Sequence, residues 1–88
     1  MKPYQVVYLP QAEKFFRKAP KNLALRILDR IDQVATNPAA SNTNLSKLKD
    51  PLSGYRLRVG DYRVIYLLDH ESYKLIVTKV DHRSAIYN

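Results

Sequence analysis

The pattern of apolar and polar positions divides the chain into a helical first half and a second half of strands. Tyr4–Leu9 reads YQVVYL, a β-branched and aromatic run that predicts a first strand. Pro10 ends this run and suits the first turn of a helix, where its missing N–H is not needed. The residues that follow predict a first helix with one apolar face, formed by Ala12, Phe15, Phe16 and Ala19.

A second helix follows at once, because Pro20 breaks the first pattern and can open the next. Its apolar stripe consists of Ala24, Ile27, Leu28, Ile31, Val34 and Ala35, and Asn37-Pro38 ends it. Two amphipathic helices joined this closely predict an αα-hairpin. The opposite face is basic, through Lys14, Arg17, Lys21, Arg26 and Arg30. Such a face either is solvated or helps to dock a polyanion.

The rest of the chain predicts a polar connection and three strands. Residues 38–54 form the connection, with Leu45 and Leu48 as anchors in the core, and the strands are Tyr55–Val59, Tyr62–Leu68 and Tyr73–Val80. The order β-αα-βββ predicts an α+β fold, in which the N-terminal helical hairpin packs on one face of an antiparallel sheet. At 88 residues, the expectation is a single domain spanning residues 1–88.

Three arginines interrupt the apolar pattern of the predicted hairpin GYRLRVGDYRVIY. Gly60-Asp61 predicts a two-residue turn, because Gly supplies a positive φ at the first turn position. This turn places Arg58 directly opposite Arg63. Arg56 shares their face, and no acid is expected among them because Asp61 lies in the turn. Directly opposed like charges destabilise a sheet by about 0.2–1 kcal/mol.

The arginine cluster has two interpretations. In the structural one, the side chains spread into water on an exposed face, so that removing Arg63 changes stability by less than about 0.5 kcal/mol. In the functional one, they form a clamp for an anion, since the planar guanidinium matches the geometry of phosphate. A rigid sheet is a suitable platform for placing several such groups.

The C-terminal segment VDHRSAIYN adds His82, Arg83 and Tyr87. A third strand antiparallel to the second ends near the predicted turn, so its exit is expected to bring Arg83 and Tyr87 towards the arginines. The register of this strand stays open, because residues 75–77 are apolar on both faces. Cationic groups beside an aromatic ring suit RNA, where arginines hold phosphate and tyrosine stacks on a base.

Charge and composition narrow the classes of function. Lys and Arg number 15 against 8 Asp and Glu, so the net charge is +7, which favours a polyanion or an acidic protein as partner over a merely soluble basic protein. The chain has no Cys, which excludes a disulfide framework and a thiolate metal site. No apolar run of about 18 residues or signal peptide is present. A cytoplasmic protein without metal, cofactor or membrane contact is expected.

The segments YRLRVGDYRVIY and VDHRSAIY, with LPQAEKFFRKAPKN and KLKDPLSGYRLR in the expected places, resemble the RelE branch of the RelE/ParE toxins. The resemblance implies the same β-αα-βββ fold in a toxin of a type II toxin–antitoxin pair. It implies a ribosome-dependent endoribonuclease that cleaves mRNA in the A site by attack of the ribose 2′-OH. It also implies a RelB-like antitoxin that wraps around the toxin in a hetero-oligomer.

The resemblance also implies roles for individual residues. Arg56 and Arg58 match two basic residues of the family site that are often lysines, and Arg63 matches the arginine that holds the scissile phosphate. Arg83 matches the arginine near the leaving 5′-oxygen. Tyr87 matches the C-terminal aromatic residue that orients or stacks the nucleotide, although it is also suited to anchor the chain end on the sheet.

The general base is left open by the sequence. Arginine is not readily deprotonated in a protein, so Arg56 and Arg58 are poor candidates where relatives carry lysine. Either His82 takes that role, or the positive site and the ribosome together are sufficient. Two other functions are the alternatives: a ParE-like toxin that targets DNA gyrase, and a non-catalytic basic module that binds RNA or protein.

Overall fold

The computed structural model describes residues 3–37, the backbone of residues 45–47, and residues 54–82. The elements are β1 (Gln5–Tyr8), α1 (Pro10–Lys18), α2 (Lys21–Thr36), β2 (Leu45–Lys47), β3 (Tyr55–Val59), β4 (Tyr62–Asp69) and β5 (Lys74–His82). The predicted helices and the four predicted strands all form, with boundaries shifted by one or two residues. Among the described residues, no helix is long and apolar enough to cross a membrane.

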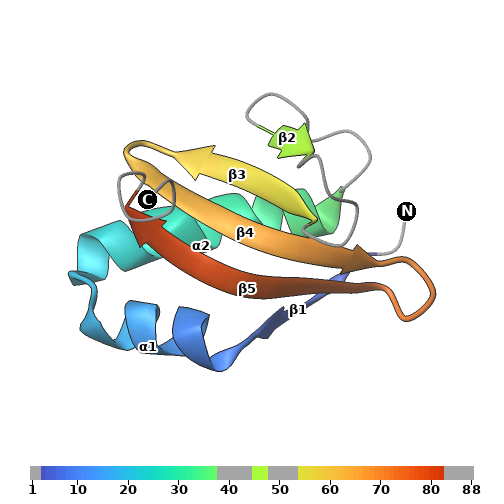
Figure 1. Ribbon diagram of the computed structural model, residues 1–88, viewed down its shortest axis with the longest axis horizontal. Coiled ribbons are helices and arrows are strands. Elements are labelled where there is room, and N and C mark those ends of the chain that lie inside the picture. Colours follow the sequence, from blue (N-terminus) through green and yellow to red (C-terminus); the bar gives the residue numbers. More distant parts are fainter. Residues whose placement is uncertain (1–2, 38–44, 48–53, 83–88) are drawn as a thin grey trace.

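The strands form one five-stranded sheet in the order β1-β5-β4-β3-β2 (Figure 1). The predicted α+β architecture, with a helical hairpin against an open sheet, is confirmed. Two details differ from the expectation. β1 pairs with β5 in parallel, so the sheet is mixed. A short strand, β2, lies within the predicted polar connection and pairs with β3. The side chains of Leu45 and Leu48, expected as core anchors, lie outside the described residues.

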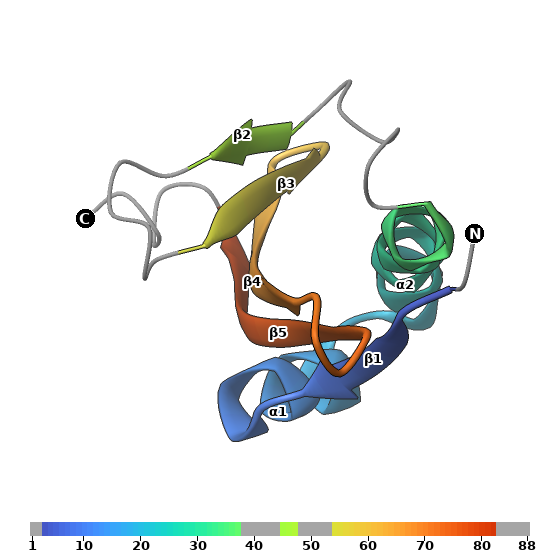
Figure 2. The ribbon, with the colours of Figure 1, turned by 90° about the vertical axis from the view of Figure 1, so that its right-hand side faces the viewer.

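The core lies between the helices and one face of the sheet, called here the helix side. From the helices it takes Ala12, Ile27, Ile31, Val34 and Ala35, and from the strands Leu57, Val59, Val64, Tyr66, Leu75, Val77 and Val80. The helical residues are those of the predicted stripes. Figure 2 shows the twisted sheet curving from β3 to β5 and β1, with α2 on the enclosed side and α1 next to β1 and β5. Burial of these residues orients the helical hairpin on the sheet.

A β-bulge in β5 changes which side chains face the helices. Tyr66 pairs with Val77 and Ile65 pairs with Lys79, so Thr78 is an extra residue between them. The hydroxyl of Thr78 donates a hydrogen bond to the Ile65 carbonyl at 3.0 Å. Because side chains alternate along a strand, one extra residue moves every later side chain to the other face.

The bulge therefore determines the faces of the last residues of β5. Val80 and His82 pair with Val64 and Tyr62 and share their helix side, whereas Asp81 pairs with Arg63 on the opposite face. Val80 is fully buried, in agreement with this placement. An unbulged strand continuing from Val77 would have placed Val80 in the outer face.

Gln11 in the first turn of α1 completes the edge of β5. β1 ends at Tyr8, and the Leu9 N–H still donates to the Val77 carbonyl at 3.0 Å. The side-chain amide of Gln11 then donates to the Val80 carbonyl at 3.1 Å, and its oxygen accepts from the Val80 N–H at 2.9 Å. A side chain thus supplies the backbone pairing that a longer β1 would have made, and it ties α1 to the C-terminal end of β5.

Candidate functional site

The predicted hairpin register is confirmed. β3 and β4 pair with Arg58 opposite Arg63 and Arg56 opposite Ile65. Gly60 has a φ of 60°, as the two-residue turn requires. Residues in directly opposed positions have Cβ atoms about 5 Å apart, so Arg58 and Arg63 leave the sheet side by side. We call the outer face that carries Arg56, Arg58 and Arg63 the arginine face.

The three arginines differ in exposure, which corrects the expectation of an exposed face. Arg58 is exposed and Arg56 half-buried, but Arg63 retains only 8% of its accessible surface. The Arg63 guanidinium donates from Nη1 to the Tyr62 carbonyl at 3.2 Å. Arg58 donates from Nε to the Gly60 carbonyl at 3.4 Å. Both guanidinium groups therefore bond to backbone carbonyls in or directly beside the hairpin turn.

An acid also lies on this face, contrary to the prediction. Asp81 is the direct cross-strand neighbour of Arg63 on β5. Its Oδ1 accepts a hydrogen bond from the His82 backbone N–H at 2.8 Å. A carboxylate beside two opposed arginines reduces their mutual repulsion. Sequence reasoning missed Asp81 because its face depends on the bulge at Thr78, and the only signal was the uncertain register of this strand.

His82 lies on the other side of the sheet from the arginines. Its ring packs edge-on against Tyr62, with centroids 5.3 Å apart and planes at 84°. The Tyr62 ring in turn packs against the ring of Phe15 in α1, with centroids 5.7 Å apart. The structure therefore does not bring His82 onto the arginine face, and its role as a general base stays a prediction without geometric support.

Arg83 and Tyr87 lie outside the described residues, so their roles also stay predictions. His82, the last described residue of β5, pairs with Tyr62 directly after the Gly60-Asp61 turn. The described part of β5 thus ends at the end of the sheet where Arg58 and Arg63 lie.

Two tyrosines that pack in or against the core have raised pKa values. Burial, and next the charge of Asp32, raise the pKa of Tyr8 to about 12. Burial, and next the neighbouring Tyr55, also raise the pKa of Tyr66, so its hydroxyl stays protonated. No group of three or more His, Asp or Glu side chains that could hold a metal occurs in the part of the chain that the structure describes.

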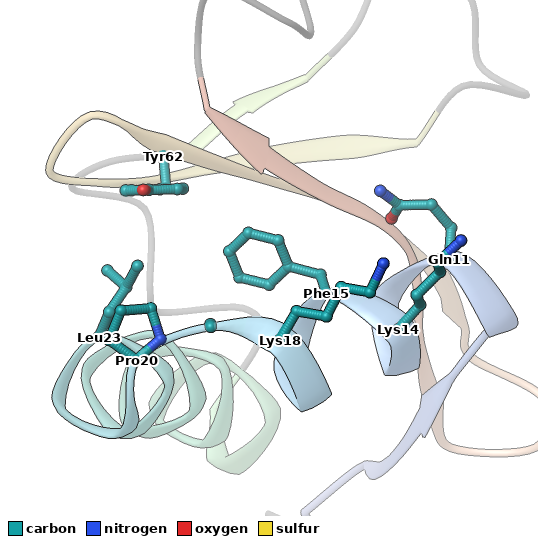
Figure 3. Close-up of a pocket in the computed structure, with 8 residues that line it drawn as sticks. Gln11, Lys14, Phe15, Lys18, Pro20, Leu23 and Tyr62 are labelled. Carbon is teal, nitrogen blue, oxygen red and sulfur yellow. The ribbon is translucent and has the colours of Figure 1, made fainter.

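A pocket of about 440 Å³ opens on the helix side, between the two helices and β4. Figure 3 shows Tyr62 and Leu23 facing each other across it, with Phe15 between α1 and the strand. It is lined by Gln11, Lys14, Phe15, Lys18, Ala19, Pro20, Leu23 and Tyr62. Sequence analysis placed several of these residues on helix faces but did not identify a pocket.

Comparison by sequence gives one family. The family model described as "ParE toxin of type II toxin-antitoxin system, parDE" matches residues 6–87. No curated protein matches the sequence.

Comparison by structure finds RelE toxins. The RelE–RelB complex from Pyrococcus horikoshii is similar with a TM-score of 0.76 and 28% identity, over 93% of this chain and 97% of that chain. The toxin–antitoxin complex RelBE2 from Mycobacterium tuberculosis has a TM-score of 0.76 and 24% identity, over 93% of this chain and 100% of that chain. A mutant of E. coli RelE in the free state has a TM-score of 0.78 and 21% identity, over 96% of this chain and 87% of that chain. The predicted RelE-like fold is confirmed.

Proposed function

Because the chain belongs to the ParE toxin family of type II toxin–antitoxin systems, we propose that it is a toxin that cleaves mRNA in the ribosomal A site and thereby stops translation. The observation that carries this proposal is the arginine face, where Arg58 and Arg63 are directly opposed and Arg56 lies alongside. A structural sheet gains nothing from opposed like charges. A site for a phosphodiester does, because the substrate supplies the missing negative charge.

The reaction proposed is an internal transesterification. The ribose 2′-oxygen forms a bond to the adjacent phosphorus while the bond from phosphorus to the 5′-oxygen breaks, which leaves a 2′,3′-cyclic phosphate and a 5′-hydroxyl. The 2′-hydroxyl gives its proton to water, and the leaving 5′-oxygen takes a proton from water, so the reaction needs no protein base. Negative charge grows on the phosphoryl oxygens in the transition state. Charge-assisted hydrogen bonds from Arg58 and Arg63 therefore stabilise the transition state more than they stabilise the ground state.

The roles proposed for the residues combine the positions of the three arginines with the resemblance to the RelE branch. Arg63, which backbone and strand neighbours hold in place, binds the scissile phosphate, and the exposed Arg58 and half-buried Arg56 bind it and its neighbour. By the resemblance to the RelE branch, Arg83 stabilises negative charge on the leaving oxygen while keeping its own proton, and Tyr87 stacks on the nucleotide. With His82 on the helix side, the proposal favours catalysis by the arginines and by the mRNA geometry that the ribosome imposes.

The partners proposed are the ribosome with its mRNA and a RelB-like antitoxin, in a toxin–antitoxin hetero-oligomer in the cytoplasm, with residues 1–88 acting as one domain. The similar structures from Pyrococcus horikoshii and Mycobacterium tuberculosis are toxins in complex with their antitoxins. The net charge of +7 favours both a nucleic acid and an acidic protein.

A second candidate is inhibition of DNA gyrase, which the match to the ParE family model favours. One experiment separates the two. The purified protein is incubated with ribosomes programmed with a defined mRNA and, separately, with gyrase and supercoiled plasmid, and RNA ends and DNA breaks are mapped. Cleavage of mRNA at the A-site codon without DNA breaks supports the proposal. DNA breaks with intact mRNA support the gyrase target. Neither product would leave a non-catalytic binding module.

A further inference from the structure

The pocket between the helices and Tyr62 lies on the opposite side of the sheet from the arginine face. Tyr62 and Arg63 are consecutive residues of β4, so their side chains leave the strand in opposite directions. Tyr62 lines the pocket and contacts Phe15 on the helix side. Arg63 pairs with Arg58 on the outer face. A molecule in this pocket therefore does not by itself occupy the proposed RNA site.

The floor of the pocket is apolar. Phe15, Leu23 and Tyr62 are partly buried and pack against the core, and Ala19 and Pro20 close the elbow between the helices. Its volume of about 440 Å³ lies in the range of sites that bind a ligand or a large side chain. The only amide in the lining, Gln11, already uses its side-chain oxygen and nitrogen on Val80. Among the described residues, the site therefore offers chiefly apolar contact to an occupant.

The rim of the pocket is basic. Lys14 and Lys18 are exposed and lie one turn apart on α1, so both ammonium groups stand on the same side of the opening (Figure 3). This combination of an apolar floor and a cationic rim fits an amphipathic peptide whose large apolar residue is flanked by Asp or Glu.

We propose that this pocket anchors a large apolar side chain from an acidic segment of the antitoxin, whose carboxylates pair with Lys14 and Lys18. The inference rests on the proposed antitoxin partner, but not on the cleavage reaction. RNA fits the pocket less well, because no arginine is among the lining residues and the Tyr62 ring already packs against Phe15 and His82. Affinity for the antitoxin and coverage of the arginine face thus belong to different surfaces.

The test measures the dissociation constant of the purified, fluorescently labelled antitoxin of this pair for variants of the purified toxin. Leu23→Ala deepens the pocket, whereas Ala19→Phe fills it without removing core atoms. Leu25→Ala is the matched control, since Leu25 is on the same helix and 55% exposed outside the pocket. For the rim, Lys18→Glu is compared with Arg17→Glu, which reverses the charge of its neighbour outside the lining. Circular dichroism and melting temperature establish that each variant is folded.

The expected result is that Ala19→Phe, Leu23→Ala and Lys18→Glu weaken binding at least tenfold, while both controls stay within about threefold. Binding that is equal for Ala19→Phe and wild type would overturn the proposal, even if Leu23→Ala is unstable. Antitoxin affinity that falls equally in Lys18→Glu and Arg17→Glu would overturn the proposed role of the basic rim. Because the assay contains no ribosome, it gives the same answer whether or not the toxin cleaves mRNA.

Discussion

Arg63 combines two properties that rarely occur together, low exposure and a position opposite another arginine. Its guanidinium bonds to the Tyr62 carbonyl, and Asp81 stands beside it on β5. In the proposed function, this fixed arginine positions the scissile phosphate, and the more exposed Arg58 also binds it. A preorganised cation is effective in catalysis because it needs no rearrangement when charge develops.

The burial of Arg63 changes the expected cost of removing it. Arg63→Ala loses a hydrogen bond and the packing of a long aliphatic stem, so we expect a loss of about 1–2 kcal/mol in the free energy of unfolding. Relief of repulsion from Arg58 offsets part of this. Arg58→Ala, at an exposed position, should stay within about 0.5 kcal/mol of wild type. Urea denaturation of both variants checks the difference, and equal stabilities would contradict the placement of Arg63.

Gly54, directly before β3, is a second residue with a sharp expectation. Its φ is +80°, and a Cβ there would overlap the carbonyl oxygen of Tyr66 and crowd a methyl group of Leu67. Gly54→Ala should therefore cost about 3 kcal/mol or more, from strain and overlap together. The control is Gly60→Ala, at φ +60°, where the added Cβ would meet only the flexible end of Arg26 at 3.2 Å. A cost of about 1 kcal/mol is expected there, and similar costs for both in thermal unfolding would refute the close approach at Gly54.

For individual residues, the sequence predicts the cross-strand partner better than it predicts the exposure of the side chain. The two-residue turn determines the register of β3 and β4, so the opposition of Arg58 and Arg63 follows from local sequence. The burial of Arg63 depends on neighbours distant in sequence, such as β5. The face of His82 likewise depends on a bulge four residues earlier, which the local pattern of apolar and polar residues does not predict.

Among the elements, the turn between β4 and β5 carries the clearest dependence on pH. Asp69 accepts hydrogen bonds from the backbone N–H groups of Ser72 and Glu71, each at 3.1 Å. These bonds, that from Ser72 first, hold the pKa of Asp69 below its ordinary value of 3.8. Because the folded pKa is lower than the unfolded one, this stabilisation is complete above the ordinary value and is lost as the pH falls through the folded value.

We expect the urea midpoint of the wild type to fall more steeply below about pH 4 than that of Asp69→Asn, which accepts similar bonds but does not titrate. Denaturation between pH 6 and pH 2 measures both. Glu71→Gln, in the same turn, controls for the loss of a carboxylate whose side chain is exposed. Parallel curves for wild type and Asp69→Asn would show that the turn does not hold the charged form.

The joint between α1 and β5 depends on the side chain of Gln11. Gln11→Ala removes both hydrogen bonds to Val80, so we expect a loss of about 1–2 kcal/mol in unfolding free energy and faster hydrogen exchange at the Val80 amide. Gln33→Ala is the control, because the side chain of Gln33 donates to the exposed side chain of Asp29 within the same helix. Unchanged exchange at Val80 in Gln11→Ala would mean that the edge of β5 is secured in another way.

The apolar pattern predicts some of the helices and strands but not all of them. Both helices were predictable because their apolar stripes are complete and proline marks each start. β2 was not, because Leu45–Lys47 is a three-residue strand in a polar stretch and forms only through pairing with β3. The bulge was hidden because residues 75–77 are apolar on both faces, so alternation gave no register.

Over the whole molecule, the sheet separates two surfaces with different chemistry. The outer face carries opposed arginines, and the helix side carries an apolar pocket with a basic rim. A net charge of +7 attracts anionic partners to both. Under the two proposals above, the antitoxin and the substrate bind through different contacts, so we expect mutations to separate the two functions.

We propose that the arginine face catalyses cleavage and that positive charge alone is not sufficient. The most direct test is the single-turnover rate of mRNA cleavage at saturating concentrations of programmed ribosomes, for Arg58→Ala and Arg17→Ala. Both substitutions remove one exposed arginine, but Arg17 lies on α1, away from the arginine face. We predict that Arg58→Ala lowers the rate at least a hundredfold, as for the loss of one transition-state donor, and that Arg17→Ala stays within about twofold. Equal rates for the two variants would contradict the account.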